Sequence, residues 1–430
     1  MSSLIGFERE DDDNVLHLFA SAFGSELAHL KYASPTVESG TKPLVENVWT
    51  PSRVIFGEDF TEVNRTLVSM LAVKWLLADQ YDIFTGGQPA RNKLTRESFH
   101  HLRQFLLDRN PSSEDISALL VALAIDDIGK DPTLTKTVEE KLSSPAQDHS
   151  EVVLCAARDG LIPSLAALRP DKQAAVLQNL QIGSKLNIAQ LVQAETAPAS
   201  LAILQDSLVP EDRQDGFSIR AVVTLLDVAG AAAHRDPRGC IVMTEPVFQP
   251  YMETITILDE FRKGTIPTPR ACYDRILSYR AEVLHRNGYS LLSPAVAQER
   301  ALLRLLCMGR VEDKGKARLF QQALEELDPF PRENLVNGLN VDGIEDGTAV
   351  LPYYAPGILA ESLRNVPDQS DASVVKVLMA FMRFLSRVFD GSKPIPGSPG
   401  DLVKRDLAFA RDTVHSDAFR ENPGILDALR

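Results

Sequence analysis

The amino-acid sequence predicts an all-α fold, an irregular bundle of helices. From Glu62 onward nearly every segment carries apolar residues at the 3.6-residue spacing of an amphipathic or buried helix. The alternation of apolar and polar residues that is typical of strands is almost absent. The sequence has no repeat of fixed length, which favours one irregular bundle over a solenoid.

The length of the chain indicates more than one helical part. With 430 residues it has room for two or three domains of roughly 150 residues each. We expect a helical extension over residues 1–60, a helical core over 61–240, and a C-terminal helical region over 241–430 that packs on the core. The Pro- and Gly-rich stretch 390–401 is expected to be a loop before a last helix that begins at Asp401.

Composition argues against several classes of partner. The longest apolar stretch, 117–125, is far shorter than the roughly 18 to 20 residues of a membrane-spanning helix. We therefore expect a cytoplasmic protein with no membrane partner. A formal charge of -14 argues against binding a nucleic-acid polymer, but not against a small phosphorylated molecule in a local basic pocket. The four cysteines are scattered, so neither a disulfide framework nor a thiolate metal site is expected.

One helix ends in an unusual stretch, ALAIDDIGKD, at residues 122–131. Asp126 and Asp127 stand at the C-terminal end of an apolar helix, where the helix dipole disfavours negative charge. One interpretation is a solvated helix end with Gly129 as the C-cap and Lys130 offsetting one charge. The other is a functional site.

Further imidazoles and carboxylates fall on neighbouring predicted helices. His100 and His101 lie on the preceding helix, His149 opens the following one, and Asp227 interrupts an otherwise apolar helix face. A buried carboxylate is costly unless it is paired or binds a metal. Mixed His and Asp ligands suit a divalent Mn, Fe, Mg, Co, Ni or Zn ion.

The order of these residues resembles that of the HD-domain superfamily of metal-dependent phosphohydrolases, through the segments HHLRQF, IDDIGK, DHSEVV and LLDVAGA. The resemblance covers about residues 95–240 and implies one or two divalent metal ions. It implies His101 as the first ligand, with His100 as the alternative, Asp127 as the bridging ligand, Asp227 as the distal ligand and His149 as an additional one.

Two departures from the family pattern concern the dyad and a later histidine pair. Asp126 stands where the family has a histidine, and the His pair of dinuclear members is missing. As an additional ligand, Asp126 would favour harder cations. The site is therefore expected to be an active mononuclear site, a dinuclear site with unusual ligands, or a decayed one.

Four basic residues are candidates for catalysis. Lys130 matches the lysine that follows the family's dyad. His234 lies two turns after Asp227, where it would act as a general acid or cap its helix. Arg235 and Arg238 would form a clamp for an anion, because guanidinium groups bind phosphate through two hydrogen bonds.

The resemblance implies hydrolysis of a phosphoester in a nucleotide or another small phosphorylated metabolite, as in some fungal pathways to purine nucleosides. One alternative is an HD-type diiron oxygenase, which needs about six His and Asp ligands. The other is a decayed, metal-free helical scaffold. A protein partner in a pathway complex is compatible with each.

Overall fold

A computed structural model describes residues 6–33, 49–142, 148–205 and 215–429. The chain divides into two compact units. Unit 1 contains residues 1–185 and 209–251, and unit 2 contains 186–208 and 252–430. The predicted all-α character is confirmed, apart from a small two-stranded sheet in unit 2.

Among the described residues of unit 1, all regular secondary structure is helical. Its α-helices are α1 Asp12–Ala22, α2 Gly24–Tyr32, α3 Pro51–Phe56, α4 Thr61–Leu77, α5 Tyr81–Phe84, α6 Arg96–Arg109, α7 Ser113–Ile125, α8 Pro132–Leu142, α9 His149–Arg158, α10 Pro163–Ala166, α11 Pro170–Gly183 and α13 Gly216–Gly230. The chain then enters α14 Glu245–Arg262.

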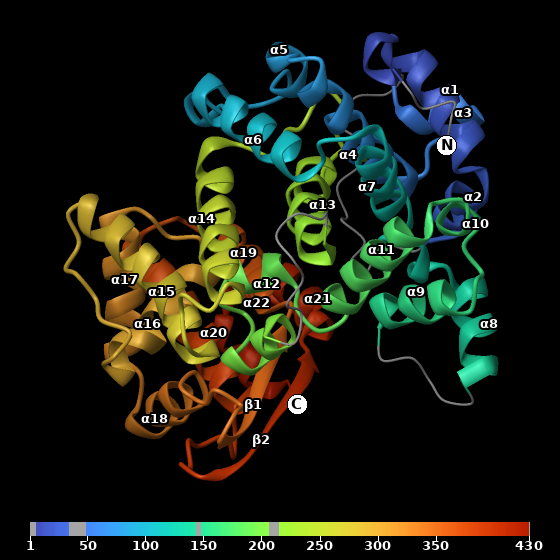
Figure 1. The fold of residues 1–430 in the computed structure, drawn as a ribbon. Coiled ribbons are helices and arrows are strands. Elements are labelled where there is room, and N and C mark those ends of the chain that lie inside the picture. The colour runs from blue at the N-terminus through green and yellow to red at the C-terminus, as the bar shows by residue number, and fades with distance from the viewer. Residues whose placement is uncertain (1–5, 34–48, 143–147, 206–214, 430) are drawn as a thin grey trace. The chain divides into compact units, whose positions relative to one another are not determined.

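The core of unit 1 is built around α4, α7, α11 and α13, which pack on one another (Figure 1). Helix α7 begins with a capping box, in which Ser112 and Asp115 exchange side-chain and backbone hydrogen bonds. Its last eight residues, 118–125, are all buried. A Cβ atom on Gly230 would lie 2.4 Å from the carbonyl oxygen of Arg65, so glycine allows α13 to approach α4 closely.

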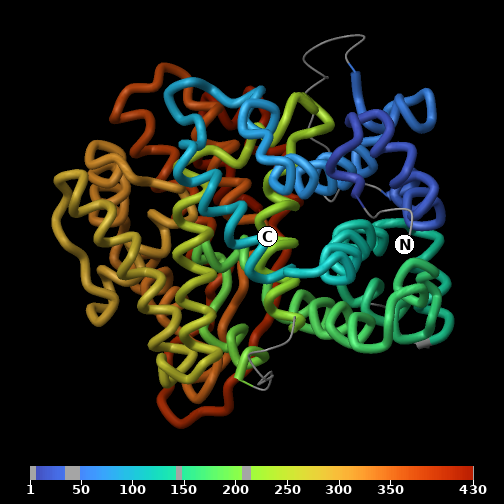
Figure 2. The backbone as a smooth tube through the Cα atoms, turned by 45° about the horizontal axis from the view of Figure 1, so that its top comes forward, coloured from blue at the N-terminus to red at the C-terminus, as the bar shows by residue number. Residues whose placement is uncertain are grey.

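Unit 2 combines helices with two strands. Its elements are α12 Ile188–Val192, α15 Pro269–Arg286, α16 Ala297–Met308, α17 Lys314–Glu325, α18 Pro329–Gly338, β1 Asp346–Tyr353, α19 Ala355–Arg364, α20 Asp371–Val388, β2 Ser398–Asp406, α21 Arg411–His415 and α22 Asp417–Glu421. Helices α15 to α18, yellow to orange in Figure 2, pack side by side.

The segment 401–406 forms a strand, so the predicted helix beginning at Asp401 is wrong there. Strand β2 pairs in parallel with β1, and the connection runs through α19 and α20. Leu402 packs on a small cluster formed by Ala197, Val341 and Ala349. Residues 401–406 are extended because they form hydrogen bonds to the distant strand β1. The spacing of apolar residues within the segment does not reveal such a pairing.

Two buried arginines on α16 hold unit 2 together, and one of them, Arg304, ties the inserted segment 186–208 to the rest of the unit. Arg304 donates hydrogen bonds to the carbonyl oxygens of Ala194, Thr196 and Leu339. Arg300 pairs with Asp342 at 3.1 Å and with Asp274 at 2.9 Å.

Within the described ranges, no helix is both long and apolar enough to cross a membrane.

Candidate functional site

The double-Asp segment lies where α7 ends and a short 3₁₀ turn, Ile128–Lys130, begins. Asp127 is 8 % exposed. Lys130 donates to its Oδ2 atom at 2.8 Å, and His149 Nε2 lies 3.9 Å from its Oδ1 atom. Lys130 and His149 thus both lie beside Asp127.

Gly129 allows α9 to begin next to this turn. A Cβ atom at position 129 would lie only 2.1 Å from the carbonyl oxygen of His149. Asp148 caps the start of α9 through its side chain, as its position before His149 favours. Glycine is therefore needed for close backbone packing here, and the proposed helix cap is not its main role.

Helix α4 supplies two charged residues that the sequence analysis missed. Glu62 is fully buried, and it accepts hydrogen bonds from Lys130 at 3.0 Å and from Arg65 at 2.8 Å. Arg65 Nη2 also lies 3.8 Å from Oδ1 of Asp227 on α13. Two cations thus connect three carboxylates from α4, α7 and α13. We call Glu62, Arg65, Asp127, Lys130 and Asp227 the charge cluster.

The pKa values within the charge cluster follow from burial and pairing. Burial would raise the pKa of Asp127, but Lys130 and Arg65 outweigh it and hold that pKa well below its usual range. Burial raises the pKa of Glu62, against the opposing effect of Arg65. Burial opposes the charge on Lys130, yet Asp127 raises its pKa. The ion pair between Asp127 and Lys130 is therefore fully charged at neutral pH.

Asp227 differs from the other carboxylates of the cluster. Burial among protein atoms raises its pKa to about 6, although Arg65 acts in the opposite direction. Its side chain nevertheless keeps 42 % of its surface exposed. Asp227 is thus the carboxylate of the cluster that solvent reaches most easily.

Asp126 belongs to a second ion pair beside the cluster. Both of its carboxylate oxygens accept hydrogen bonds from Arg220 on α13, at 3.0 and 3.3 Å. This two-point pairing is the strongest geometry available to an arginine and a carboxylate. Arg220 was also missed by the sequence analysis, and it satisfies the residue that stands at the dyad's histidine position.

The remaining predicted residues have different surroundings. Nδ1 of His100 lies 3.5 Å from Oδ1 of Asp79. The ring of His101 packs edge-on against the ring of Phe248. Burial lowers the pKa of His149. Burial, together with Arg65 and Arg235, lowers the pKa of His234 to about 4, so this imidazole is neutral at pH 7.

The two arginines of the predicted anion clamp, Arg235 and Arg238, interact with neighbouring residues of their own segment. Arg238 donates to both carboxylate oxygens of Asp236, at 2.8 and 2.6 Å, while 67 % of its side chain is exposed. Arg235 acts on His234 through its charge. Binding of an anion by these arginines stays a prediction.

The donor set fits a divalent metal ion poorly. Among residues 6–33, 49–142, 148–205 and 215–429, no group of three or more His, Cys, Asp or Glu side chains could hold a metal ion. Arg65 and Lys130 lie between the carboxylates and would repel a further cation. The metal site implied by the HD resemblance stays a prediction.

One signal in the sequence could have revealed Glu62 and Arg65. They stand three residues apart near the start of α4, whose following residues are almost all buried and apolar. A charged pair at such a place indicates a buried partner elsewhere. Arg220 stands without a charged neighbour of this kind, and its partner Asp126 lies 94 residues away in the chain.

A family model, described as "Family of unknown function (DUF6829)", matches residues 16–426. No curated protein and no solved structure matches the chain significantly.

Proposed function

The chain belongs to the DUF6829 family, whose function is unknown, and we propose that it is a metal-free, HD-like helical scaffold or partner protein. The observation that carries the proposal is the charge cluster. Arg65 and Lys130 supply two positive charges among Glu62, Asp127 and Asp227. A metal ion would supply such charges in an HD phosphohydrolase.

The second support comes from the position of the missing dyad histidine. Asp126 is held by Arg220 through two hydrogen bonds, and the side chain of Arg220 is only 13 % exposed. The carboxylate of Asp126 therefore has a protein partner and does not need a metal ion. The departure at Asp126 is thus matched by a side-chain cation.

In this proposal the charge cluster is structural. It joins α4, the end of α7 and α13, and it lies against the start of α9. Such a cluster stabilises unit 1 only while every charge keeps its partner, since an uncompensated buried charge is strongly destabilising. The scaffold or partner role then depends on surfaces that the folded unit 1 holds in place.

The test is the melting temperature of the full chain with EDTA, without additive, and with Mn²⁺, Fe²⁺ or Mg²⁺. We expect no shift, because a ligand stabilises a fold only when it binds the native state. A rise with one of these ions that disappears in both Asp127→Ala and Asp227→Ala would contradict the proposal.

A second candidate is the metal-dependent phosphohydrolase acting on a nucleotide or another small phosphorylated metabolite. One observation favours it: Asp227 is exposed to solvent and has a raised pKa, as functional carboxylates often do. Phosphate release from a nucleotide panel, lost in Asp227→Asn and kept in the exposed control Asp108→Asn, would support this candidate. The diiron oxygenase requires more ligands and is favoured less.

A further inference from the structure

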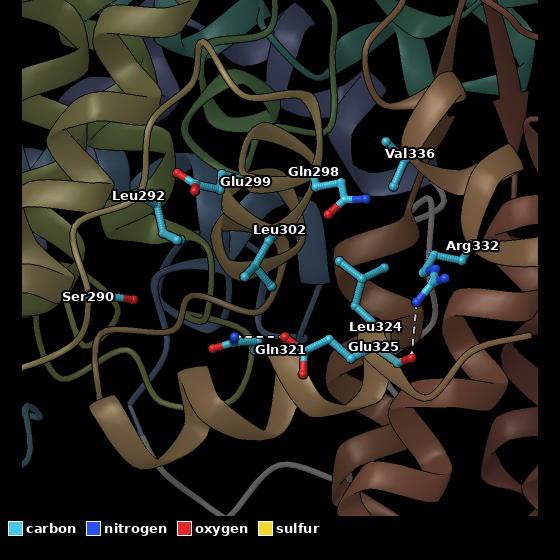
Figure 3. Close-up of a pocket in the computed structure, with 10 residues that line it drawn as sticks. All are labelled: Ser290, Leu292, Gln298, Glu299, Leu302, Gln321, Leu324, Glu325, Arg332 and Val336. Carbon is cyan, nitrogen blue, oxygen red and sulfur yellow. Dashed lines mark hydrogen bonds between the residues drawn. The ribbon is translucent and has the colours of Figure 1, made fainter. Parts of the chain in front are cut away.

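Unit 2 contains a cavity of about 290 Å³ between α16, α17, α18 and the segment that precedes α16. Figure 3 shows the side chains that surround it. Its volume lies near the lower end of the range for small-ligand pockets, roughly 300 to 1,000 Å³. A compact ligand would therefore fill it.

The floor of the cavity is apolar. Leu292, Leu302 and Leu324 line it and are each less than one-tenth exposed. Leu302 and Leu324 point into the centre of the space in Figure 3. An apolar group placed on these leucines would leave water without displacing any polar contact.

Two carboxylates and one guanidinium group stand around this floor. Glu299 accepts a hydrogen bond from the backbone N–H of Ser293 at 2.6 Å, and Glu325 accepts one from Gln321 at 2.8 Å. Arg332 donates one N–H to the carbonyl oxygen of Glu325 at 3.2 Å. A carboxylate accepts about four hydrogen bonds and a guanidinium donates five, so each group retains capacity for a ligand.

Arg332 lies next to Glu325, because it donates to the carbonyl oxygen of that residue. Arg332 comes from α18, whereas Glu299 comes from α16 and Glu325 from α17. In Figure 3 Arg332 lies at one side of the leucines, and Glu299 lies at the other. A ligand that carries only a positive or only a negative group would leave either Arg332 or Glu325 unmatched.

We propose that this cavity binds a small zwitterion of the apolar α-amino acid class. Its ammonium group faces Glu325, its carboxylate faces the neighbouring Arg332, and its apolar side chain lies on the three leucines. The site is independent of the charge cluster in unit 1. It gives the chain a ligand-binding role whether or not unit 1 is catalytic.

The test is isothermal titration of the full chain with L-leucine, L-methionine and L-phenylalanine. For the strongest binder, two analogues follow, one lacking the carboxylate and one lacking the amino group. We expect one site per chain and at least about tenfold weaker binding of each analogue. Absence of binding by all three amino acids would overturn the proposal.

Substitutions of residues that line the cavity test whether the ligand binds there. Arg332→Gln and Glu325→Gln should each weaken binding about tenfold or more. Glu333→Gln, an exposed neighbour on α18, should leave it unchanged. If a charge variant fails to fold, Leu302→Phe, which fills the cavity, replaces it and should abolish binding. Equal affinity in a folded cavity variant and the parent would overturn the assignment.

Discussion

The ammonium group of Lys130 lies 2.8 Å from Oδ2 of Asp127 and 3.0 Å from Oε2 of Glu62. One lysine thus pairs with two buried carboxylates, one from the turn after α7 and one from α4. The side chains of Lys130, Asp127 and Glu62 are 9 %, 12 % and 0 % exposed. This arrangement makes the cluster sensitive to the loss of a single cation.

Lys130→Met should therefore strongly destabilise unit 1. Removing the lysine leaves Asp127 and Glu62 close together with less compensation, and breaking a buried pair in this way costs about 3 to 5 kcal/mol. Urea unfolding followed by circular dichroism measures the change. Lys136→Met, at a side chain that is 79 % exposed, is the matched control. Equal stabilities of the two variants would contradict a structural role for the cluster.

The Asp126–Arg220 pair should show a measurable coupling energy. A double-mutant cycle with Asp126→Asn and Arg220→Gln is expected to give a coupling energy of about 1 kcal/mol or more. The reason is that two hydrogen bonds join the side chains and both side chains are largely buried. The half-exposed pair of Arg275 and Glu282 provides the comparison and should give less. A coupling near zero for Asp126 and Arg220 would remove one support for the metal-free proposal.

Gly129→Ala should destabilise the fold by about 1 to 3 kcal/mol, because the new methyl group would collide with the carbonyl of His149. Gly24→Ala is the control, since a Cβ atom there has nothing within 4 Å. Comparing the free energies of unfolding of both variants with that of the parent tests this prediction. A neutral Gly129→Ala variant would show that the start of α9 can move away from the turn.

Asp227 should make stability depend on pH in a specific direction. Its pKa rises from 3.8 to about 6 on folding, so between these values the native state binds more protons than the unfolded state. Its contribution to stability is therefore lost as the pH rises through this window. Asp227→Asn should remove that part of the slope. Parallel stability curves for parent and variant between pH 4 and 6.5 would contradict the assignment.

Sequence reasoning succeeds where the determining contacts are local. The end of α7 at the double Asp and the contact of Lys130 with Asp127 three residues away both follow from short-range rules. The start of α9 at His149 is of the same kind.

The same reasoning fails where distant segments decide the outcome. It did not find that α4 brings Glu62 and Arg65 to the cluster, or that Arg220 reaches Asp126. It also missed the strands, because β2 is held by hydrogen bonds to β1, about 50 residues earlier in the chain.

In the charge cluster, we propose, side-chain cations take the place of a metal ion. Elemental analysis of the full chain, purified without chelator, tests it most directly, with Asp127→Ala and Asp227→Ala measured beside it. We predict far less than one transition-metal or magnesium ion per chain in all three proteins. One or two ions per chain in the parent, lost in both variants, would contradict the account.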